Sequence, residues 1–336
     1  MALTQRHIAV LGAGSWGTAL AVLLARGGEP TVLWGRDPAQ AEKMCRERCN
    51  RRFLPDNPFP TDLQVTSDLA EALQQAWSVV MVVPSYAFRE LLRKARPLLG
   101  AGTGLAWGTK GFEPGTGRLL HEVVLDLVGE EVPVAVISGP TFAREVAAGL
   151  PTAVAIAAND ERFATELAAR LHSSRFRVYT STDLVGVQVG GAVKNVLAIA
   201  AGIADGLGLG ANTRAALITR GLAELTRLGV ALGGQPTTFM GLAGLGDLVL
   251  TCTDDQSRNR RLGLILGRGA SVEAARAAVS QVVEGVEATG VVMTLSRKHA
   301  VEMPICGEVH RVLRGQCTPR AAVESLLSRE LKPEFS

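Results

Sequence analysis

A glycine-rich turn near the N-terminus constrains the fold more than any other feature of the sequence. The apolar run His7–Leu11 (HIAVL) is a predicted strand, and Gly12-Ala13-Gly14-Ser15-Trp16-Gly17 follows it directly. Residues 18–26 form a predicted helix that ends before a pair of glycines. A strand, a G-x-G-x-x-G turn and a helix in this order are typical of a dinucleotide-binding βαβ unit.

Each glycine of the turn has its own expected role. Gly12 permits the tight turn, Gly14 lets the backbone approach a pyrophosphate, and Gly17 lets the helix pack closely on the strand. Free N–H groups at the helix N-terminus would hold the pyrophosphate. Because glycine-rich turns are common, the motif gains its weight from the strand and the helix on either side.

Other apolar runs predict the rest of a mostly parallel sheet: residues 31–34, 79–83, 105–107, 134–137, 153–157 and 176–179. In open α/β sheets, ligands bind beyond the carboxyl ends of the strands. Gly12, Lys110 and Gly139 each come shortly after a strand, so we expect them to lie together at one edge. Pro140 is predicted as the first residue of a helix, which would leave nearby N–H groups free for a ligand.

The end of the second strand indicates which nucleotide is bound. Thr31–Trp34 is followed by Gly35-Arg36-Asp37, with Pro38 next. An NAD-specific site places an acid here, whereas an arginine can accommodate a 2′-phosphate. Asp37 is predicted to cap a charged helix over residues 41–52. We therefore expect NADPH to be preferred without NADH being excluded; the alternative for Arg36 is a solvated loop charge.

A long apolar stretch dominates the second half of the chain. Residues 196–204 carry no polar side chain, which predicts a buried helix, and Lys194 and Asn195 stand at the start of this run. A buried lysine is costly unless it is paired or functional. Burial lowers a lysine pKa towards the range useful for proton transfer. The alternative is a core helix whose lysine extends to the solvent at its end. The pair Gly190-Gly191 would let another backbone or a ligand approach closely.

A polar cluster further on resembles an anion site. Ser257, Arg258 and Asn259 are followed by two more arginines, a composition that suits phosphate. The alternative is a solvated helix start. The stretch from Val282 to Gly285 is a second possible cofactor contact. Asn212 is predicted to cap a helix over residues 212–232.

Bulk properties narrow the class of protein. The 336 residues favour two domains, which we place at residues 1–181 and 182–336. A net charge of +3 does not indicate a nucleic-acid partner. Five cysteines without a C-x-x-C pair predict free thiols in a reducing compartment, and five scattered histidines predict no metal site. No continuous run of about 18 apolar residues is present, so we expect a soluble, cytoplasmic protein without a membrane span.

Taken in order, the motifs resemble those of bacterial soluble NAD(P)-dependent glycerol-3-phosphate dehydrogenases. The resemblance covers nearly the whole chain and rests on these segments: GAGSWGTALA from Gly12, GTKG from Gly108, SGPTFAREVAAGLPTA from Ser138, GGAVKNVLAIAAG from Gly190, NTRAALITRGLAE from Asn212, GLAGLGDLVLTCT from Gly241, QSRNRRLG from Gln256 and VVEG from Val282. It implies an α/β N-terminal Rossmann-like domain followed by an all-α C-terminal domain. It also implies interconversion of sn-glycerol 3-phosphate and dihydroxyacetone phosphate, supplying glycerol phosphate for phospholipids.

The resemblance also implies roles for individual residues. Lys194 would transfer the proton. Substrate would contact Lys110, Gly139, Thr141, Lys194, Asp247, Ser257, Arg258 and Asn259. The nucleotide would contact Ser15, Trp16, Arg36, Lys110, Ala143, Arg258, Val282 and Glu284, besides the glycine turn.

Two other functions compete with this one. A two-domain dehydrogenase for a β-hydroxy acid or a sugar phosphate would also place a lysine on the first helix after a Rossmann domain. A non-catalytic NADPH-binding redox sensor would bind the nucleotide without turnover and would not need both lysines. We expect the protein to form a homodimer.

Overall fold

The computed structural model describes residues 6–279, 282–331 and 333–334. The chain forms two compact units, Met1–Gln188 and Val189–Ser336, which are described separately. The boundary expected after residue 181 coincides with the end of the last strand. The observed division falls seven residues later, inside a long helix.

Within the described residues, unit 1 contains one sheet of eight strands in the order β3-β2-β1-β4-β5-β6-β7-β8. The strands are β1 (His7–Leu11), β2 (Thr31–Trp34), β3 (Leu63–Thr66), β4 (Ala76–Met81), β5 (Gly104–Trp107), β6 (Val134–Ser138), β7 (Thr152–Ala158) and β8 (Phe176–Ser181). Neighbouring strands are parallel except for β6 and β7, which are antiparallel. The expected mostly parallel sheet is therefore confirmed. Strand β3 was not predicted, and β4 ends at Met81 rather than at residue 83.

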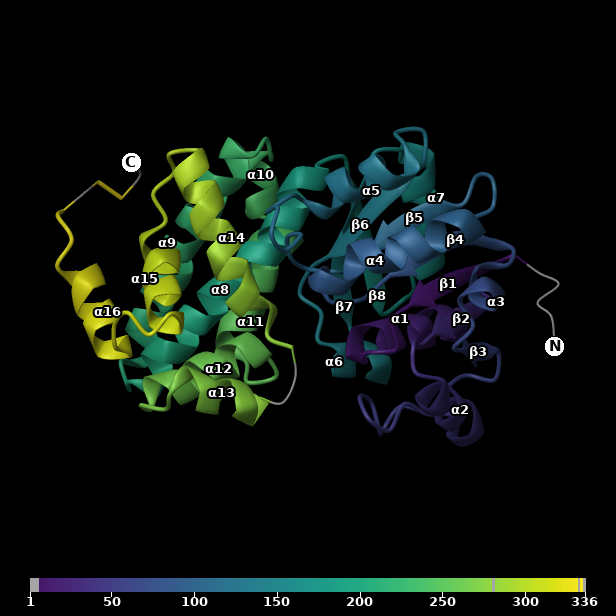
Figure 1. The fold of residues 1–336 in the computed structure, drawn as a ribbon, viewed down its shortest axis with the longest axis horizontal. Coiled ribbons are helices and arrows are strands. Elements are labelled where there is room, and N and C mark those ends of the chain that lie inside the picture. The colour runs from purple at the N-terminus through teal and green to yellow at the C-terminus, as the bar shows by residue number, and fades with distance from the viewer. Residues whose placement is uncertain (1–5, 280–281, 332, 335–336) are drawn as a thin grey trace. The chain divides into compact units, whose positions relative to one another are not determined.

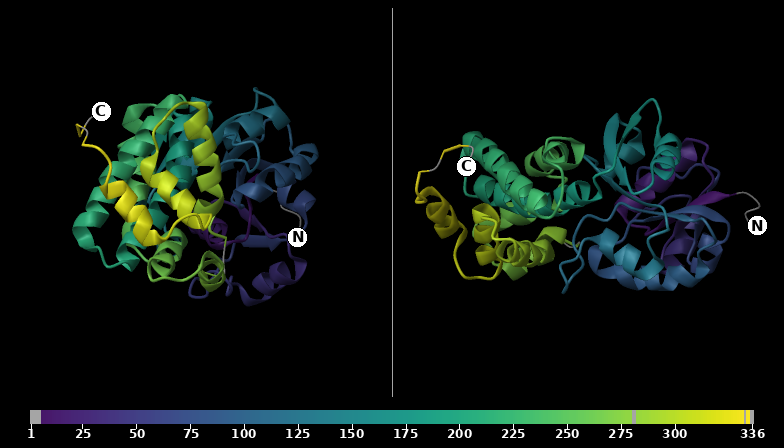
Figure 2. Two further views of the ribbon diagram at one scale, coloured as in Figure 1. Left: turned by 60° about the vertical axis from the view of Figure 1, so that its left-hand side comes forward. Right: turned by 90° about the horizontal axis from the view of Figure 1, so that it is seen from above.

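Helices cover both faces of this sheet (Figure 2). They are α1 (Ser15–Arg26), α2 (Pro38–Glu47), α3 (Leu69–Leu73), α4 (Ser85–Ala95), α5 (Leu120–Val128), α6 (Ala143–Ala148) and α7 (Glu161–Leu171), with a short 3₁₀ turn at Arg96–Leu98. Helix α1 packs against α6 and α7, and α4 packs against α5. The core between the layers is made of Val, Leu, Ile and Ala side chains, including fully buried Ile8, Leu20 and Leu33.

Unit 2 is helical throughout the part that the structure describes (Figure 1). Its helices are α8 (Leu184–Gly206, which begins in unit 1), α9 (Gly210–Ala231), α10 (Pro236–Phe239), a π-helical turn (Leu242–Gly246), α11 (Asp247–Thr253), α12 (Arg258–Gly267), α13 (Val272–Val279), α14 (Glu284–Lys298), α15 (Pro304–Leu313) and α16 (Pro319–Leu327). Helix α8 is long and apolar enough to cross a membrane, but 89% of its most apolar window is buried inside the protein. It is therefore the core helix expected from its sequence.

Four glycines let two helices of unit 2 meet backbone to backbone. A Cβ added at Gly202 or Gly206 of α8 would lie 2.1 Å or 2.5 Å from a carbonyl oxygen of α12. A Cβ added at Gly263 or Gly267 of α12 would lie 2.2 Å or 2.4 Å from a carbonyl oxygen of α8. Real Cβ atoms do not come this close to other atoms, so these positions require glycine.

Several predicted helix boundaries are wrong. Helix α2 covers residues 38–47 instead of 41–52, because Arg48 takes a left-handed conformation (φ 49°) that ends it. Helix α6 begins at Ala143 and not at Pro140, because Phe142 is still extended. Helix α9 begins at Gly210, so Asn212 lies inside the helix and does not cap it. Lys194 lies in the middle of α8, and the apolar run predicted to follow it continues in the same helix.

Candidate functional site

The glycine turn of unit 1 has the geometry expected of it. Gly12 has φ 126°, and a Cβ there would lie 2.4 Å from the Val82 carbonyl oxygen. A Cβ on Gly17 would lie 1.9 Å from the carbonyl oxygen of Gly12, so the helix packs directly on the turn. Around Gly14, in contrast, no atom of the residues that the structure describes lies within 4 Å of an added Cβ. The turn is thus tight on its inner side and open at Gly14.

The N-terminus of α1 is available to an anion. Gly14 is the N-cap residue, and within the described part of the chain no side chain makes a capping hydrogen bond there. The first N–H groups of a helix have no partner within the helix, and they attract phosphate. The open backbone at Gly14 and the uncapped helix therefore fit a dinucleotide pyrophosphate.

Asn50 supports this turn, and sequence reasoning missed it. Its Nδ2 donates to the Ala13 carbonyl at 3.0 Å and to Thr18 Oγ1 at 2.8 Å, and its side chain is buried. The predicted charged helix over residues 41–52 had placed Asn50 on a helical surface. The signal that could have identified it is an amide next to the proline-rich loop of residues 53–60.

The end of β2 carries the two residues expected to select the nucleotide. Arg36 is exposed directly after the strand. Asp37 accepts hydrogen bonds from the backbone N–H groups of Ala39 (3.0 Å) and Gln40 (3.4 Å), which confirms it as the cap of α2. The carboxylate of Asp37 is therefore engaged in capping α2, whereas Arg36 faces solvent.

The ends of β1, β5 and β6 meet at one edge of the sheet, as predicted. Lys110 Nζ donates to the Gly139 carbonyl at 3.0 Å, and Thr141 Oγ1 donates to the same oxygen at 3.2 Å. Gly139 has φ 152°, and a Cβ there would lie 3.1 Å from Val154 Cα. The indole of Trp16 packs against Gly108, where a Cβ would lie 2.6 Å from its Nε1.

In unit 2, Lys194 is buried and paired. Its Nζ lies 2.6 Å from Asp247 Oδ1 and 2.7 Å from Thr251 Oγ1, and Lys194 is 6% exposed. Thr251 in turn donates to the Asp247 carbonyl at 2.6 Å. Direct pairing offsets the cost of burying the Lys194 ammonium group and the Asp247 carboxylate. The alternative of a lysine extending to the helix end is therefore wrong. The role of Thr251 could not be read from the sequence, because it lies 57 positions away.

Near Lys194, the backbone of α8 comes close to the π-helical turn before α11. The lysine lies one turn after Gly190, where a Cβ would come within 2.5 Å of the Ala243 carbonyl oxygen. Gly190 therefore lets α8 approach the π-helical turn that leads into Asp247, which is the close backbone contact expected of this glycine pair. Such π-helical turns occur frequently at functional sites.

Asn195 and Asn259 form a hydrogen-bonded chain beside Lys194. Asn259 Nδ2 donates to Asn195 Oδ1 at 2.9 Å, and the Gly285 N–H donates to Asn259 Oδ1 at 3.0 Å. These contacts join α8, α12 and the start of α14. Both the nitrogen and the oxygen of the Asn259 amide therefore form a hydrogen bond within the protein.

The polar cluster at the start of α12 divides into different roles. Ser257 is buried and caps the helix, accepting from the Arg260 N–H at 3.2 Å. Arg258 is exposed, and the Glu284 carboxylate is close enough to act on its charge. Arg260 is buried against Asp205, with Nη1 2.5 Å from Oδ2. Of these two arginines, Arg258 is therefore the one whose side chain is exposed, whereas Arg260 is buried.

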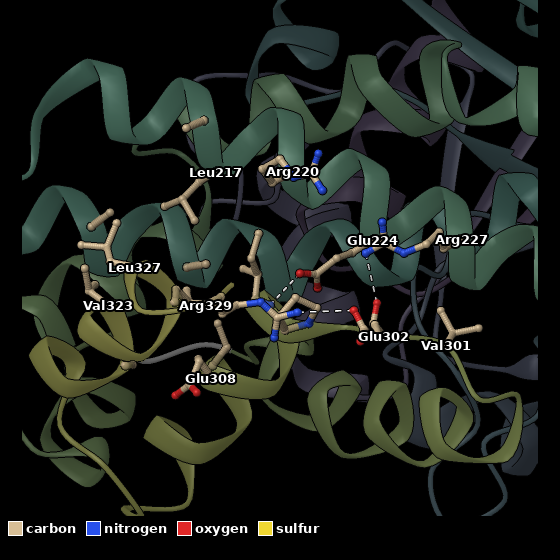
Figure 3. A pocket seen from close by; sticks show the side chains of 18 of the residues that line it. Leu217, Arg220, Glu224, Arg227, Val301, Glu302, Glu308, Val323, Leu327 and Arg329 are labelled. Atoms are coloured by element: carbon tan, nitrogen blue, oxygen red, sulfur yellow. Dashed lines mark hydrogen bonds and ion pairs between the residues drawn. The ribbon is translucent and has the colours of Figure 1, made fainter. Parts of the chain in front are cut away.

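A cavity of about 1290 Å³ lies elsewhere in unit 2, between α8, α9, α15 and α16 (Figure 3). Its wall is largely apolar, and several of its charged groups bind the protein itself. Arg227 donates to the Glu302 carbonyl at 3.1 Å, and Arg329 lies 3.3 Å from the Glu302 carboxylate. None of the residues predicted to bind ligands lines this cavity, so we do not assign the chemistry to it.

Comparisons with known proteins agree over both halves of the chain. The family model for the NAD-dependent glycerol-3-phosphate dehydrogenase N-terminus matches residues 7–164, and the model for the C-terminus matches residues 183–324.

Individual proteins are similar over nearly their full length. The glycerol-3-phosphate dehydrogenase [NAD(P)+] of Aeromonas salmonicida is 57% identical, with 98% of this chain and 99% of that protein covered. The protein of the same name from Nitrosococcus oceani is 59% identical, with 97% and 95% covered. The crystal structure of glycerol-3-phosphate dehydrogenase from Coxiella burnetii matches with a TM-score of 0.93 and 53% identity, over 96% of this chain and 99% of that one.

Proposed function

The chain belongs to the NAD-dependent glycerol-3-phosphate dehydrogenase family, and we propose that it interconverts sn-glycerol 3-phosphate and dihydroxyacetone phosphate. The observation that carries this proposal is the buried Lys194, held by Asp247 and Thr251 on a helix of unit 2. The uncapped α1 helix and the open Gly14 supply the second requirement, a place for a dinucleotide.

The proposed chemistry assigns proton transfer to Lys194. When bound, the nicotinamide nucleotide supplies the hydride for ketone reduction and accepts it in the reverse direction. Lys194 Nζ stabilises the negative charge that develops on the C2 oxygen and then protonates it. Asp247 and Thr251 fix the position of Nζ through hydrogen bonds of 2.6 Å and 2.7 Å. A proton donor fixed before reaction needs little reorganisation during it.

The ligand contacts are proposed by family membership together with the geometry. We assign the nucleotide to Gly12, Gly14, Ser15, Trp16, Gly17, Arg36, Lys110, Ala143, Arg258, Val282 and Glu284. We assign the substrate to Lys110, Gly139, Thr141, Lys194, Asp247, Ser257, Arg258 and Asn259. The burial of Ser257 and the bonding of Asn259 to Asn195 favour supporting roles for these two, with Arg258 as the direct phosphate ligand.

The wider setting is also a proposal. We assign nucleotide binding to residues 1–181 and substrate binding to residues 182–336, which is supported by the end of β8 at Ser181. All five cysteines are free, which is typical of a reducing compartment and supports a cytoplasmic enzyme. The enzyme would act as a homodimer that supplies glycerol 3-phosphate for phospholipids. Light scattering at micromolar concentration tests the dimer.

Oxidation of NADPH with dihydroxyacetone phosphate tests the activity. Dihydroxyacetone, which lacks the phosphate, is the matched substrate. We expect kcat/KM for dihydroxyacetone to be far lower, because binding energy from the remote phosphate helps to align C2. Arg258→Ala should narrow this gap, since its planar guanidinium matches phosphate.

The outcomes separate the proposed enzyme from its rivals. Turnover of a β-hydroxy acid or another sugar phosphate in place of dihydroxyacetone phosphate would identify a different dehydrogenase. NADPH binding without turnover of any of these substrates would favour the redox sensor. Equal kcat/KM values for the two ketones would show that the phosphate is not recognised.

A further inference from the structure

The loop that carries Lys110, residues 108–119, is fixed at its start by the end of strand β4. The loop joins β5 to α5, and Gly108 N donates to the Met81 carbonyl at 2.9 Å. Thr109 Oγ1 donates to the Val83 carbonyl at 2.7 Å, and Phe112 is buried. Long irregular loops inside compact domains are usually functional. What holds the middle of this loop therefore matters for Lys110.

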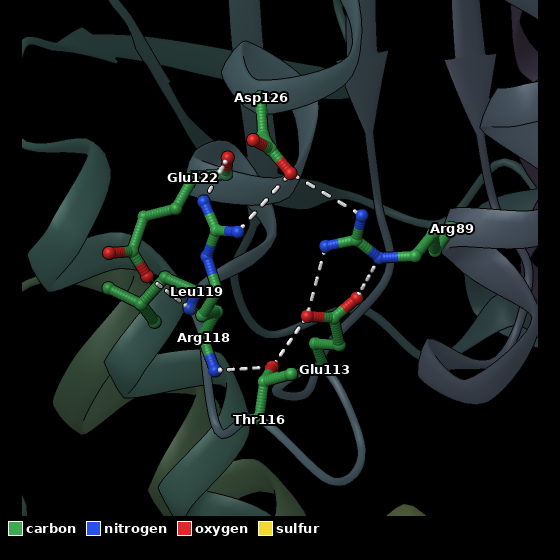
Figure 4. Close-up of polar contacts among 7 residues, drawn as sticks. All are labelled: Arg89, Glu113, Thr116, Arg118, Leu119, Glu122 and Asp126. Carbon is green, nitrogen blue, oxygen red and sulfur yellow. Dashed lines mark hydrogen bonds and ion pairs between the residues drawn. The ribbon is translucent and has the colours of Figure 1, made fainter.

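Glu113, three residues after Lys110, is the centre of a polar network (Figure 4). Its side chain is buried, and it pairs through both oxygens with the guanidinium of Arg89 on α4. Arg89 Nη2 lies 3.2 Å from Oε2, and Nε contacts Oε1. Thr116 Oγ1 donates to Oε2 at 2.5 Å. A bidentate pair of this kind fixes orientation as well as distance.

The loop backbone closes around the same residue. Glu113 N donates to the Arg118 carbonyl at 2.9 Å, and Gly117 N donates to the Glu113 carbonyl at 3.0 Å. Asp126 on α5 accepts from Arg89 at 3.4 Å and from Arg118 at 3.3 Å. Figure 4 shows Arg89 and Arg118 on opposite sides of this carboxylate. Helices α4 and α5 thus both hold the loop.

The charge on Glu113 is favoured despite its burial. Hydrogen bonding from Arg89 lowers the pKa of the Glu113 carboxyl group, and burial opposes this effect. Removing one partner of such a pair leaves a buried charge without compensation. The network therefore favours a single arrangement of the loop, with Lys110 placed between the anchor at Thr109 and the anchor at Glu113.

We propose that Glu113, held by Arg89, is a positioning residue for Lys110 in the dehydrogenase reaction. This inference rests on the proposed function, in which Lys110 contacts substrate and nucleotide. Glu113 acts only through Lys110: it holds the loop so that Nζ stays beside the Gly139 carbonyl, 3.0 Å away. A displacement of about 1 Å at a catalytic group can cost roughly 100-fold in rate.

A double-mutant cycle tests this role. The kcat/KM for dihydroxyacetone phosphate is measured in wild type, Glu113→Gln, Lys110→Met and the double variant. We expect Glu113→Gln alone to lower kcat/KM by about 10- to 100-fold. With Lys110 already replaced, the same change should matter by no more than about two-fold, because the two residues act on one step. Glu166→Gln is the matched control, since it breaks an exposed ion pair of the same unit with Arg162.

The outcomes distinguish a wrong role for Lys110 from a wrong role for Glu113. If Lys110→Met leaves kcat/KM unchanged, the role of Lys110 in the proposed function is wrong. If Lys110→Met is harmful but the two effects multiply, Glu113 does not act through Lys110 and the positioning inference is overturned. Unchanged kcat/KM in Glu113→Gln overturns it as well. Should Glu113→Gln fail to fold, Thr116→Val removes one hydrogen bond from the same carboxylate and takes its place in the cycle.

Discussion

Lys194 is the single residue on which the proposed chemistry depends most. Its ammonium group is held by Asp247 and Thr251, so replacing Lys194 with methionine keeps the apolar stem and removes only the charged group. We expect turnover to fall by at least about 100-fold, the lower limit of what general acid–base catalysis contributes. NADPH binding, measured by fluorescence titration, should persist. Near-normal turnover would exclude Lys194 as the proton donor.

Arg36 is the residue that we expect to set the nucleotide preference. It is exposed directly after β2, while Asp37 next to it caps α2. A charged hydrogen bond to a phosphate contributes about 1.5–3 kcal/mol, so Arg36→Ala should raise the KM for NADPH by roughly 10- to 100-fold. The KM for NADH should change little. Steady-state kinetics with both nucleotides make the comparison, and equal losses would mean that Arg36 does not contact the 2′-phosphate.

The sequence allowed single residues to be predicted better than their partners. Lys194, Lys110 and the glycine turn stand in recognisable local patterns. Asn50, Thr251 and Glu113 do not, because their roles depend on contacts with residues distant in the chain. The neighbouring residues in the sequence do not show whether a carboxylate or an amide faces solvent or completes a hydrogen-bond network. Such partners become visible only when the tertiary structure brings the segments together.

At the scale of an element, the start of α15 is held by a carboxylate from another helix. Glu224 on α9 is 1% exposed and accepts from the N–H groups of Ile305 (2.6 Å) and Cys306 (3.1 Å). Pro304 at the first helical position has no N–H to offer. Glu224 thus replaces the missing capping side chain of α15.

Burial raises the pKa of Glu224 to about 7, although the two backbone hydrogen bonds oppose the shift. An acid whose pKa is higher in the folded state binds a proton on folding. Its contribution to stability therefore falls as pH rises from about 4.5 to about 7, and the loss is complete above that range. Glu224→Gln cannot titrate, so its free energy of unfolding should decline less over this range than that of wild type.

Urea denaturation between pH 5 and pH 8 measures this difference. Glu166→Gln serves as the control for loss of an exposed carboxylate. At pH 5, where Glu224 is protonated, the variant should also be less stable than wild type, because its single amide oxygen cannot replace both oxygens that accept from Ile305 and Cys306. Parallel curves for wild type and Glu224→Gln would show that Glu224 does not titrate in this range.

Secondary structure was predictable where turn residues bound an apolar run, and less so where a backbone angle decides where an element begins or ends. Strands β1 and β2 begin and end at their predicted residues. Asn212 has the side chain of a capping residue, yet the chain already turns at Gly208 and Gly210, both with positive φ, and the helix starts before Asn212. A side-chain preference at one position is weaker than the geometry that neighbouring glycines impose.

At the scale of the whole molecule, the order of elements determined the fold class. Alternating strands and helices in the first half predicted a sheet with helices on both faces, and the loss of strand signals after β8 predicted a helical second half. Both are confirmed. The composition of α8, in contrast, is also compatible with a membrane span, and only its burial identifies it as a core helix.

The backbone contact between α8 and α12 affects how a saturation mutagenesis experiment should be interpreted. Alanine at Gly202, Gly206, Gly263 or Gly267 would force apart the two helices that carry Lys194 and Arg258. A growth or activity screen would therefore rank these four positions among the most intolerant, although no ligand is assigned to them. Parallel measurement of protein abundance would separate loss of folding from loss of ligand binding: abundance should collapse at the glycines and persist at the exposed Arg258.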